Sequence, residues 1–285
     1  MNSIIDTIII ASGIHKPDPK QANIIRELHL FFKQLNVHYL ADDTWSRLIP
    51  ESIPHHQYQQ QPNSLLLIIG GDGSFLRTHT LAHQLKAPIL GVNLGRLGFL
   101  ADLSPNDATQ QLPHIIQGRY HLEERCLLAI EHHQQSFIAL NECTIKHHSS
   151  SHILPTALTI DNQPVFEQLS DGVIIATPTG STAYNLSAGG PIMHPSVPGF
   201  IITSISPHRL NSRPMIIPNH SILRLSTNQK AVLNIDGQHY VDITHPLTIQ
   251  RHSQSLKFIH PLSYDYYKVV QQKLHWEIDA ASRSH

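Results

Sequence analysis

The sequence has little of several features that would assign it to common classes of protein. It has 2 cysteines in 285 residues, Cys126 and Cys143, so we expect no disulfide framework and predict a reducing compartment, the cytoplasm. Charged residues make up 14% and the formal net charge is -1, so no basic excess exists to bind nucleic acid or an anionic membrane. No apolar run approaches the roughly 18 residues of a membrane span. We therefore expect neither nucleic-acid nor membrane partners.

Histidine, by contrast, is abundant, with 23 residues that include the pairs 55–56, 132–133 and 147–148. Adjacent residues of a strand point to opposite faces, which is poor geometry for chelating one metal ion. No H-E-x-x-H motif and no Cys/His zinc spacing occurs. We therefore predict no metal site built by the protein itself.

Strand and helix patterns alternate over the first part of the chain. Residues 4–11 and the continuous apolar run 65–69 indicate strands, and the periodicity of 20–35 predicts an amphipathic helix. A further helix is expected at 74–85, and Ser104-Pro105 forms an N-cap followed by proline at the first helical position. This alternation predicts a doubly wound α/β domain.

The character changes near residue 120, where short β-rich runs separated by turn signals begin. These runs predict a mostly antiparallel β domain with one short helix near 183–188. The tail 264–276 has a helical pattern. The expected organisation is an N-terminal α/β domain (1–119), a β-rich domain (120–262) and a C-terminal helix (263–285) that packs back on the N-terminal domain.

The first chemical motif is LLLIIGGDGSFLR (65–77), in which a buried strand runs into a glycine turn and then a helix. Gly71 and Gly73 allow backbone N–H groups to approach a phosphate, and the helix N-terminus favours negative charge. Asp72 is then a carboxylate beside a phosphate-binding turn, where it can accept the proton of an attacking hydroxyl. An ordinary tight turn with a turn aspartate is the structural alternative. The motif is not a Walker loop, because no G-K-[ST] follows.

Two weaker motifs follow. GVNLGRLGFLAD (91–102) again joins a strand end to glycines, and Phe99 can stack on an adenine ring or simply belong to the core. Asn141-Glu142, at a strand end, can hydrogen-bond ribose hydroxyls and an adenine edge, although a dipeptide has almost no specificity.

The most informative motif is SDGVIIATPTGSTAYNLSAGGPI (170–192). A strand closes at Pro178, and the hydroxyls and backbone N–H groups of TGSTAY (179–184) make a polar cradle suited to a nucleotide. Tyr184 adds a flat face and a hydroxyl. A Ser/Thr-rich loop without function is the alternative interpretation.

In this order and spacing, the four motifs resemble the NAD kinase family, and so do SPHRLNSRPMIIP (206–218) and HPLSYDYYKVVQQKLHW (260–276). The resemblance covers residues from about 65 to 276. It implies transfer of the γ-phosphoryl group of ATP to the 2′-hydroxyl of the adenosine ribose of NAD, which makes NADP. It further implies Asp72 as general base, a divalent metal such as Mg²⁺ with ATP, and a homo-oligomer, either dimer or tetramer.

The motifs and the resemblance together predict a set of NAD-binding residues. Gln238 belongs to this set by its family position, although Asp236-Gly237-Gln238 can also be only a hairpin turn. Leu169 departs from the family pattern, which often has Arg or Gly there, and leaves open the preference for NAD or NADH and the range of donors. The predicted NAD-binding residues are Gly71, Gly73, Phe99, Asn141, Glu142, His152, Asp171, Thr179, Thr182, Ala183, Tyr184, Ser187 and Gln238.

Two other functions compete with this interpretation. A lipid or sugar kinase of the diacylglycerol-kinase type shares a GGDG-like turn, but TPTGSTAY and the lack of a basic amphipathic segment count against it. A nucleotide-binding regulator without catalysis would keep the polar cradle but would need no base, whereas Asp72 is intact beside its glycines.

Overall fold

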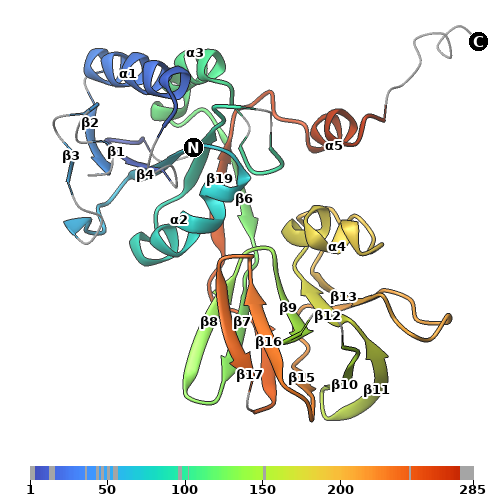
Figure 1. Cartoon of the computed structure of the whole chain (residues 1–285). Helices are drawn as coiled ribbons and strands as arrows, with labels where there is room; N and C mark the ends of the chain where they lie inside the picture. Colours follow the sequence, from blue (N-terminus) through green and yellow to red (C-terminus); the bar gives the residue numbers. More distant parts are fainter. Residues whose placement is uncertain are drawn as a thin grey trace, which may run out of the picture. The chain divides into compact units, whose positions relative to one another are not determined.

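The structure is a computed structural model with two compact units (Figure 1). Unit 1 comprises Met1–Glu123 and Lys257–His285, and unit 2 comprises Glu124–Leu256. The structure describes residues 4–12, 17–35, 37–42, 45, 48–49, 52–53, 57–95, 98–101, 103–149, 152–243 and 245–276.

Unit 1 is built around a seven-stranded sheet in the order β3-β2-β1-β4-β5-β19-β6, in which β3 to β19 pair in parallel. Its strands are β1 (Thr7–Ala11), β2 (His38–Asp42), β3 (Ser52–Ile53), β4 (Ser64–Ile69), β5 (Ile89–Val92), β6 (His121–Arg125) and β19 (Leu256–His260). Its helices are α1 (Pro19–Gln34), α2 (Asp72–Leu85), α3 (Pro105–Ile116) and α5 (Tyr266–Leu274).

Helices cover both faces of this sheet, with α1 and α3 on one side and α2 on the other (Figure 1). The apolar faces of α1 and α3 form one core with alternate residues of the strands, including Leu28, Leu112 and Leu67. On the other face, Phe75 of α2 packs directly against Gly91, where an added Cβ would lie 2.3 Å from the ring. The arrangement is the predicted doubly wound α/β fold.

Local signals explain where the helices of unit 1 begin. Asp18 and Ser104 cap α1 and α3, and each forms a capping box with the residue three positions later. A proline follows each cap, at a position where its missing N–H has no partner to lose. Asp265 caps α5 by accepting the N–H groups of the second and third residues that follow it.

Unit 2 contains two six-stranded antiparallel sheets, β11-β10-β15-β18-β7-β8 and β14-β13-β12-β9-β16-β17. The strands of the first are β7 (Leu128–His132), β8 (Gln135–Ala139), β10 (Leu154–Ile160), β11 (Gln163–Ser170), β15 (Leu223–Ser226) and β18 (Leu247–Arg251). Those of the second are β9 (Glu142–His147), β12 (Gly172–Ala176), β13 (Gly199–Ile205), β14 (Met215–Pro218), β16 (Ala231–Ile235) and β17 (His239–Ile243). A 3-10 helix, η3 (Thr179–Thr182), and α4 (Tyr184–Ser187) follow β12.

Strand β12 is buried on both faces, which explains its continuous apolar sequence within an antiparallel sheet. Val173 and Ile175 join the core shared by the two sheets, whereas Ile174 and Ala176 pack in a second cluster with Tyr184 against its edge. The residues that leave this strand therefore begin from a rigid position. The predicted fold class, an α/β domain with a mostly antiparallel β domain, is confirmed.

Among the described residues, no helix is both long enough and apolar enough to cross a membrane.

Candidate active site

The GGDG turn (70–73) lies at a topological switch point of the unit 1 sheet. β1 has β2 on one side and β4 on the other, and such points bind ligands in α/β sheets. Gly70, directly after β4, adopts φ 147°, a conformation that side chains rarely allow. Its N–H donates to the Val92 carbonyl at the end of β5, at 2.8 Å. No atom of the described residues lies within 4 Å of a Cβ built on Gly71, so they leave the space above the turn open.

Asp72 is the first residue of α2, and two backbone groups hold its carboxylate. The Phe99 N–H donates to Oδ2 at 2.9 Å, and the Leu100 N–H donates to Oδ1 at 3.1 Å. The helix N-terminus adds a favourable dipole for the negative charge. Each oxygen keeps a second lone pair, and the side chain is partly exposed. The carboxylate is therefore fixed in direction and still free to accept a proton.

Gly98 is the residue that makes this arrangement possible. A Cβ built on Gly98 would lie 1.8 Å from Asp72 Oδ1 and 2.6 Å from Cγ. The carboxylate thus occupies the space of the missing side chain, which lets it reach the next two N–H groups. Arg96, Leu97 and Asp102 of the same motif lie outside the described residues.

We expect Gly98→Ala to separate activity from stability. The methyl group would displace Asp72 by about 1 Å or more, and such a misplacement can reduce turnover on the order of 100-fold. The free energy of unfolding should fall by only about 1 kcal/mol, because the atoms that the methyl group meets belong to the end of a flexible side chain, which can move. Turnover and thermal unfolding measure the two effects. Gly95→Ala is the matched control, since the nearest atom of the described residues to its Cβ would be Asn93 Oδ1 at 3.9 Å.

Two positively charged side chains lie beside the GGDG turn and Phe99, and neither was identified from the sequence. The Arg77 guanidinium, one turn into α2, has Nη1 3.5 Å from the Cβ position of Gly73. Lys273 of α5 places Nζ 5.8 Å from the centroid of the partly exposed Phe99 ring. Both charges suit a site that receives an anionic substrate.

In unit 2, Asn141 and Glu142 lie on a buried turn from β8 into β9. Both side chains are almost fully buried, at 6% and 8% exposure. Asn141 Oδ1 and Glu142 Oε2 have no hydrogen-bond partner among the described residues. Buried oxygens without partners are costly for a fold and rare in native structures, so each of them needs an explanation, such as a ligand that binds there.

Glu142 has a strongly perturbed acidity. Burial, and secondarily the negative charge of Asp236, raise its pKa from 4.5 to about 8, while a hydrogen bond from the Tyr184 backbone opposes the rise. The side chain is therefore mainly neutral near pH 7, and its O–H can donate a hydrogen bond. Perturbed acidity of this kind is typical of functional sites.

The TGSTAY segment packs directly onto this pair. A Cβ built on Gly180 would lie 2.2 Å from the Asn141 carbonyl oxygen. The Thr177 hydroxyl donates to the Leu140 carbonyl at 2.6 Å, and the Thr177 N–H donates to the Asn141 carbonyl at 2.8 Å. The structure thus brings two predicted motifs together, and the buried η3 residue Thr179 lies in the same segment.

Asn185 fixes the shape of the loop that follows. Its amide donates to the carbonyls of Ser181 and Pro191, at 3.0 and 3.1 Å, and its oxygen accepts from the Thr203 hydroxyl at 2.7 Å. A Cβ built on Gly190 would lie 1.9 Å from that oxygen. One buried amide therefore holds the loop at several places.

Lys146 is a charged neighbour of Tyr184 that the sequence did not indicate. Its Nζ donates to the Tyr184 hydroxyl at 2.6 Å and lies 4.5 Å from the ring centroid. A Cβ built on Gly172 would lie 2.3 Å from the Ile145 carbonyl oxygen and 2.9 Å from Lys146 Cγ. The glycine after Asp171 therefore makes room for the backbone of the neighbouring strand β9 and for the side chain of this lysine.

The other predicted residues of unit 2 occupy several places. His152 stacks on His147 with ring centroids 4.8 Å apart, beside a pocket of about 450 Å³. Asp171 is exposed and precedes β12, Ser187 is exposed at the end of α4, and Thr182 and Ala183 are partly buried before it. Gln238 closes the β16–β17 hairpin, where its N–H donates to the Ile235 carbonyl.

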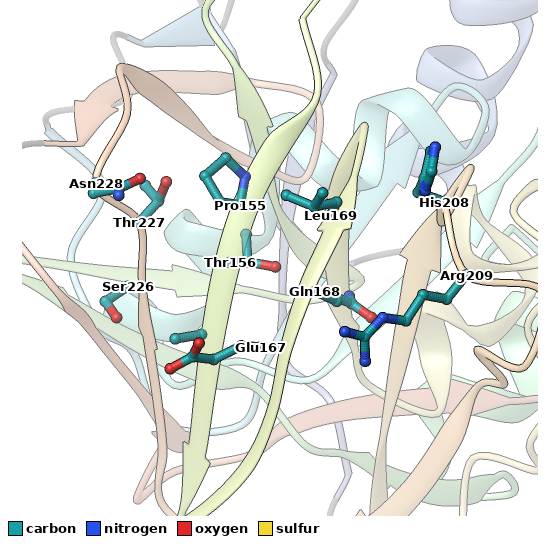
Figure 2. Close-up of a pocket in the computed structure, with 11 residues that line it drawn as sticks. Pro155, Thr156, Glu167, Gln168, Leu169, His208, Arg209, Ser226, Thr227 and Asn228 are labelled. Carbon is teal, nitrogen blue, oxygen red and sulfur yellow. The ribbon is translucent and has the colours of Figure 1, made fainter.

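Leu169, the departure from the family pattern, lies at the rim of a larger pocket of about 530 Å³ (Figure 2). It is 47% exposed, and its carbonyl accepts the His208 N–H at 2.9 Å. Figure 2 draws the lining residues on β10, β11 and the segments 208–209 and 226–228.

The chain matches two family models, the ATP-NAD kinase N-terminal domain over residues 31–120 and the ATP-NAD kinase C-terminal domain over residues 140–260. It is 35% identical to an NAD kinase of Acinetobacter baylyi over 92% of this chain and 90% of that protein. The chain belongs to the ATP-NAD kinase family. This membership confirms the family that the motifs resemble.

Two solved structures share the ATP-NAD kinase fold. A yeast NADH kinase complexed with NADH has a TM-score of 0.80 at 24% identity. The match covers 99% of this chain and 91% of the yeast chain. An NAD kinase from Archaeoglobus fulgidus in complex with ATP has a TM-score of 0.77 at 24% identity. This second match covers 95% of this chain and 100% of the Archaeoglobus chain.

Proposed function

We propose that Asp72 is the general base of phosphoryl transfer from ATP to the 2′-hydroxyl of the adenosine ribose of NAD. The reaction class follows from family membership, since the chain is an ATP-dependent NAD kinase that phosphorylates NAD to NADP. Membership of the ATP-NAD kinase family favours this reaction over the interpretations as a diacylglycerol-kinase-like enzyme or a non-catalytic regulator. The observation that carries the base assignment is the orientation of the Asp72 carboxylate by two backbone N–H groups.

Asp72 would accept the proton of the attacking hydroxyl as the new P–O bond forms. The backbone of Gly71 and Gly73 at the helix N-terminus, with Arg77 beside it, would face phosphate oxygens. Catalysis of this type depends on positioning and electrostatics more than on covalent chemistry.

The polar residues of unit 2 would bind the dinucleotide. Asn141 and Glu142 offer buried oxygens that have no partner in the described part of the chain, and these suit ribose hydroxyls and an adenine edge. Tyr184 offers a ring and a hydroxyl beside the Lys146 cation. The remaining predicted residues would each contribute a contact to NAD: Phe99 from unit 1, and His152, Asp171, Thr179, Thr182, Ala183, Ser187 and Gln238 from unit 2.

A divalent ion, Mg²⁺, would accompany ATP and neutralise charge on the phosphates. Ions of this kind are commonly held by one or two carboxylates together with substrate phosphates. Among the described residues, no group of three or more His, Cys, Asp or Glu side chains could hold such an ion, so the phosphates of the substrates would be its main ligands.

The proposal extends to the state of the protein in the cell. The protein would be cytoplasmic. Its two cysteines are free thiols, which is typical of proteins in a reducing compartment. Exposed apolar side chains in unit 2, among them Leu210 and Ile216, support a homo-oligomer, either dimer or tetramer. Light scattering of the purified protein measures the oligomeric state.

The deciding experiment is NADP formation. Purified protein is mixed with NAD, ATP and Mg²⁺, and the product is detected with an NADP-specific dehydrogenase. We expect NADP from NAD and no phosphorylation of diacylglycerol offered as acceptor. Binding of NAD without ATP consumption would contradict the activity and favour the regulator, whereas turnover of diacylglycerol would favour the lipid kinase.

A further inference from the structure

Asp236 is a buried carboxylate that holds the turn on which Asn141 and Glu142 lie. It follows β16 and is 3% exposed. Its Oδ2 accepts the Leu140 N–H at 2.7 Å, and its Oδ1 accepts the N–H groups of Asn141 and Glu142 at 2.8 and 3.0 Å. One side chain thus satisfies three consecutive backbone donors almost a hundred residues away in the sequence.

We propose that Asp236 is a positioning residue that fixes Asn141 and Glu142 in the orientation that binds NAD. The proposal rests on the proposed function of these two residues. Pairing of β9 with β16 brings Ile235 opposite Cys143, which places Asp236 beside the start of β9. On the opposite side, Thr177 and Gly180 contact the same turn, so the turn is held between two segments.

The unpartnered oxygens of the pair indicate that this positioning serves a ligand. All three backbone donors of the turn bind Asp236, whereas Asn141 Oδ1 and Glu142 Oε2 are buried without a partner among the described residues. A turn held only for stability would gain nothing from orienting such oxygens. A bound dinucleotide would satisfy both groups, because its hydroxyl and amino groups can donate to Asn141 Oδ1 and its ring nitrogens and ribose oxygens can accept from the neutral Glu142 carboxyl.

The charge of Asp236 supplies a second effect. After burial, it is the main cause that raises the pKa of Glu142 to about 8. The other groups around this carboxyl are Cys143, whose pKa is also raised, the Tyr184 backbone that donates to it, and Lys146 beyond Tyr184. Below that pH Glu142 is neutral. Above it, two carboxylates would repel each other and the anionic dinucleotide, so NAD binding weakens as the pH rises.

The test is the Michaelis constant for NAD, measured at saturating ATP and Mg²⁺ from pH ~6 to ~9.5 across the expected titration. In the wild type, KM should rise as the pH passes about 8. Asp236→Asn loses an acceptor and the charge, so KM should rise about tenfold near neutral pH with kcat little changed. In this variant, the rise of KM with pH should begin at a lower pH than in the wild type, because the pKa of Glu142 falls when the negative charge of Asp236 is removed.

Two variants serve as controls. The side chain introduced by Glu142→Gln cannot ionise, so KM for NAD should not rise with pH in this variant. In the double variant with Asp236→Asn, KM should likewise stay independent of pH. Asp242→Asn makes the same exchange on the neighbouring strand β17, where the side chain is 76% exposed, and should behave as the wild type. Asparagine tolerates the left-handed backbone of position 236, where φ is 50°, so Asp236→Asn adds no backbone strain.

An unchanged KM in Asp236→Asn, or a KM raised by the same factor at every pH, overturns the proposal. If Asp236→Asn does not fold, Asp236→Glu decides: it keeps the charge but alters the spacing, so KM should rise while the pH dependence stays in place. An unchanged KM there also overturns the proposal. Calorimetry of NAD binding without ATP measures the affinity of the same variants in the absence of turnover. A protein that forms no NADP can therefore still confirm or contradict the role of Asp236, so the two failures are distinguishable.

Discussion

Asp72→Asn should reduce NADP formation by roughly 100- to 10,000-fold while NAD binding stays near that of the wild type, because the general base is removed and the shape is kept. The amide oxygen can still accept one of the two N–H bonds, from Phe99 or Leu100, but its NH₂ group would face the other donor. We expect a loss of stability of about 1 kcal/mol from that mismatch. Initial rates and calorimetric NAD binding measure the two effects.

Asp6→Asn is the control for this substitution, because Asp6 is an exposed carboxylate of the same unit that accepts side-chain hydrogen bonds from Thr7 and Asn63. It should leave turnover unchanged. Near-normal turnover in Asp72→Asn would contradict the base assignment. If Asp72→Asn loses NAD binding as well as turnover, the carboxylate contributes to binding rather than to proton transfer alone.

Gly180→Ala should have the largest effect on stability among the glycine variants. Its Cβ would lie 2.2 Å from the oxygen, 2.5 Å from the carbon and 2.8 Å from Cα of Asn141, all of which are backbone atoms. Neither segment can yield easily, because Thr177 ties the same turn to the end of β12. We expect destabilisation of about 3 kcal/mol or more, which lowers the melting temperature by roughly 10 °C.

The same variant should bind NAD poorly, because any relief of the clash moves Asn141 away from its orientation. Thermal unfolding and KM for NAD measure these effects, with Gly95→Ala again as the control with ordinary contacts. A melting temperature and a KM equal to those of the wild type would mean that TGSTAY does not pack against Asn141 as described.

The sequence predicted elements best where a local signal marks their ends. Ser104-Pro105 gave the start of α3, because a capping side chain and a proline act within one turn. The expected helix at 74–85 in fact begins at Asp72, since Gly71 caps it without a side-chain hydrogen bond and so resembles a loop. The expected strand at 4–11 begins at Thr7, and Ile4 is exposed.

The chemistry of the site was harder to predict where it depends on long-range pairing. The Asp236-Gly237 signal predicts a hairpin, and both residues do have positive φ, at 50° and 68°. That the Asp236 side chain also binds residues 140–142 follows from the register of β9 on β16, which no local pattern contains. Lys146 is a similar case, because the room beside Gly172 appears only when β9 and β12 pair.

The three hydrogen bonds of Asn185 affect the thermodynamics of nucleotide binding. Because the amide already joins Ser181, Pro191 and Thr203, the loop loses little conformational freedom when a nucleotide arrives. Binding should then carry a small entropic penalty and a heat-capacity change that reflects only the apolar surface covered by the ligand. Replacing Asn185 would make the loop order itself at each encounter, which weakens affinity without removing a single contact to the substrate.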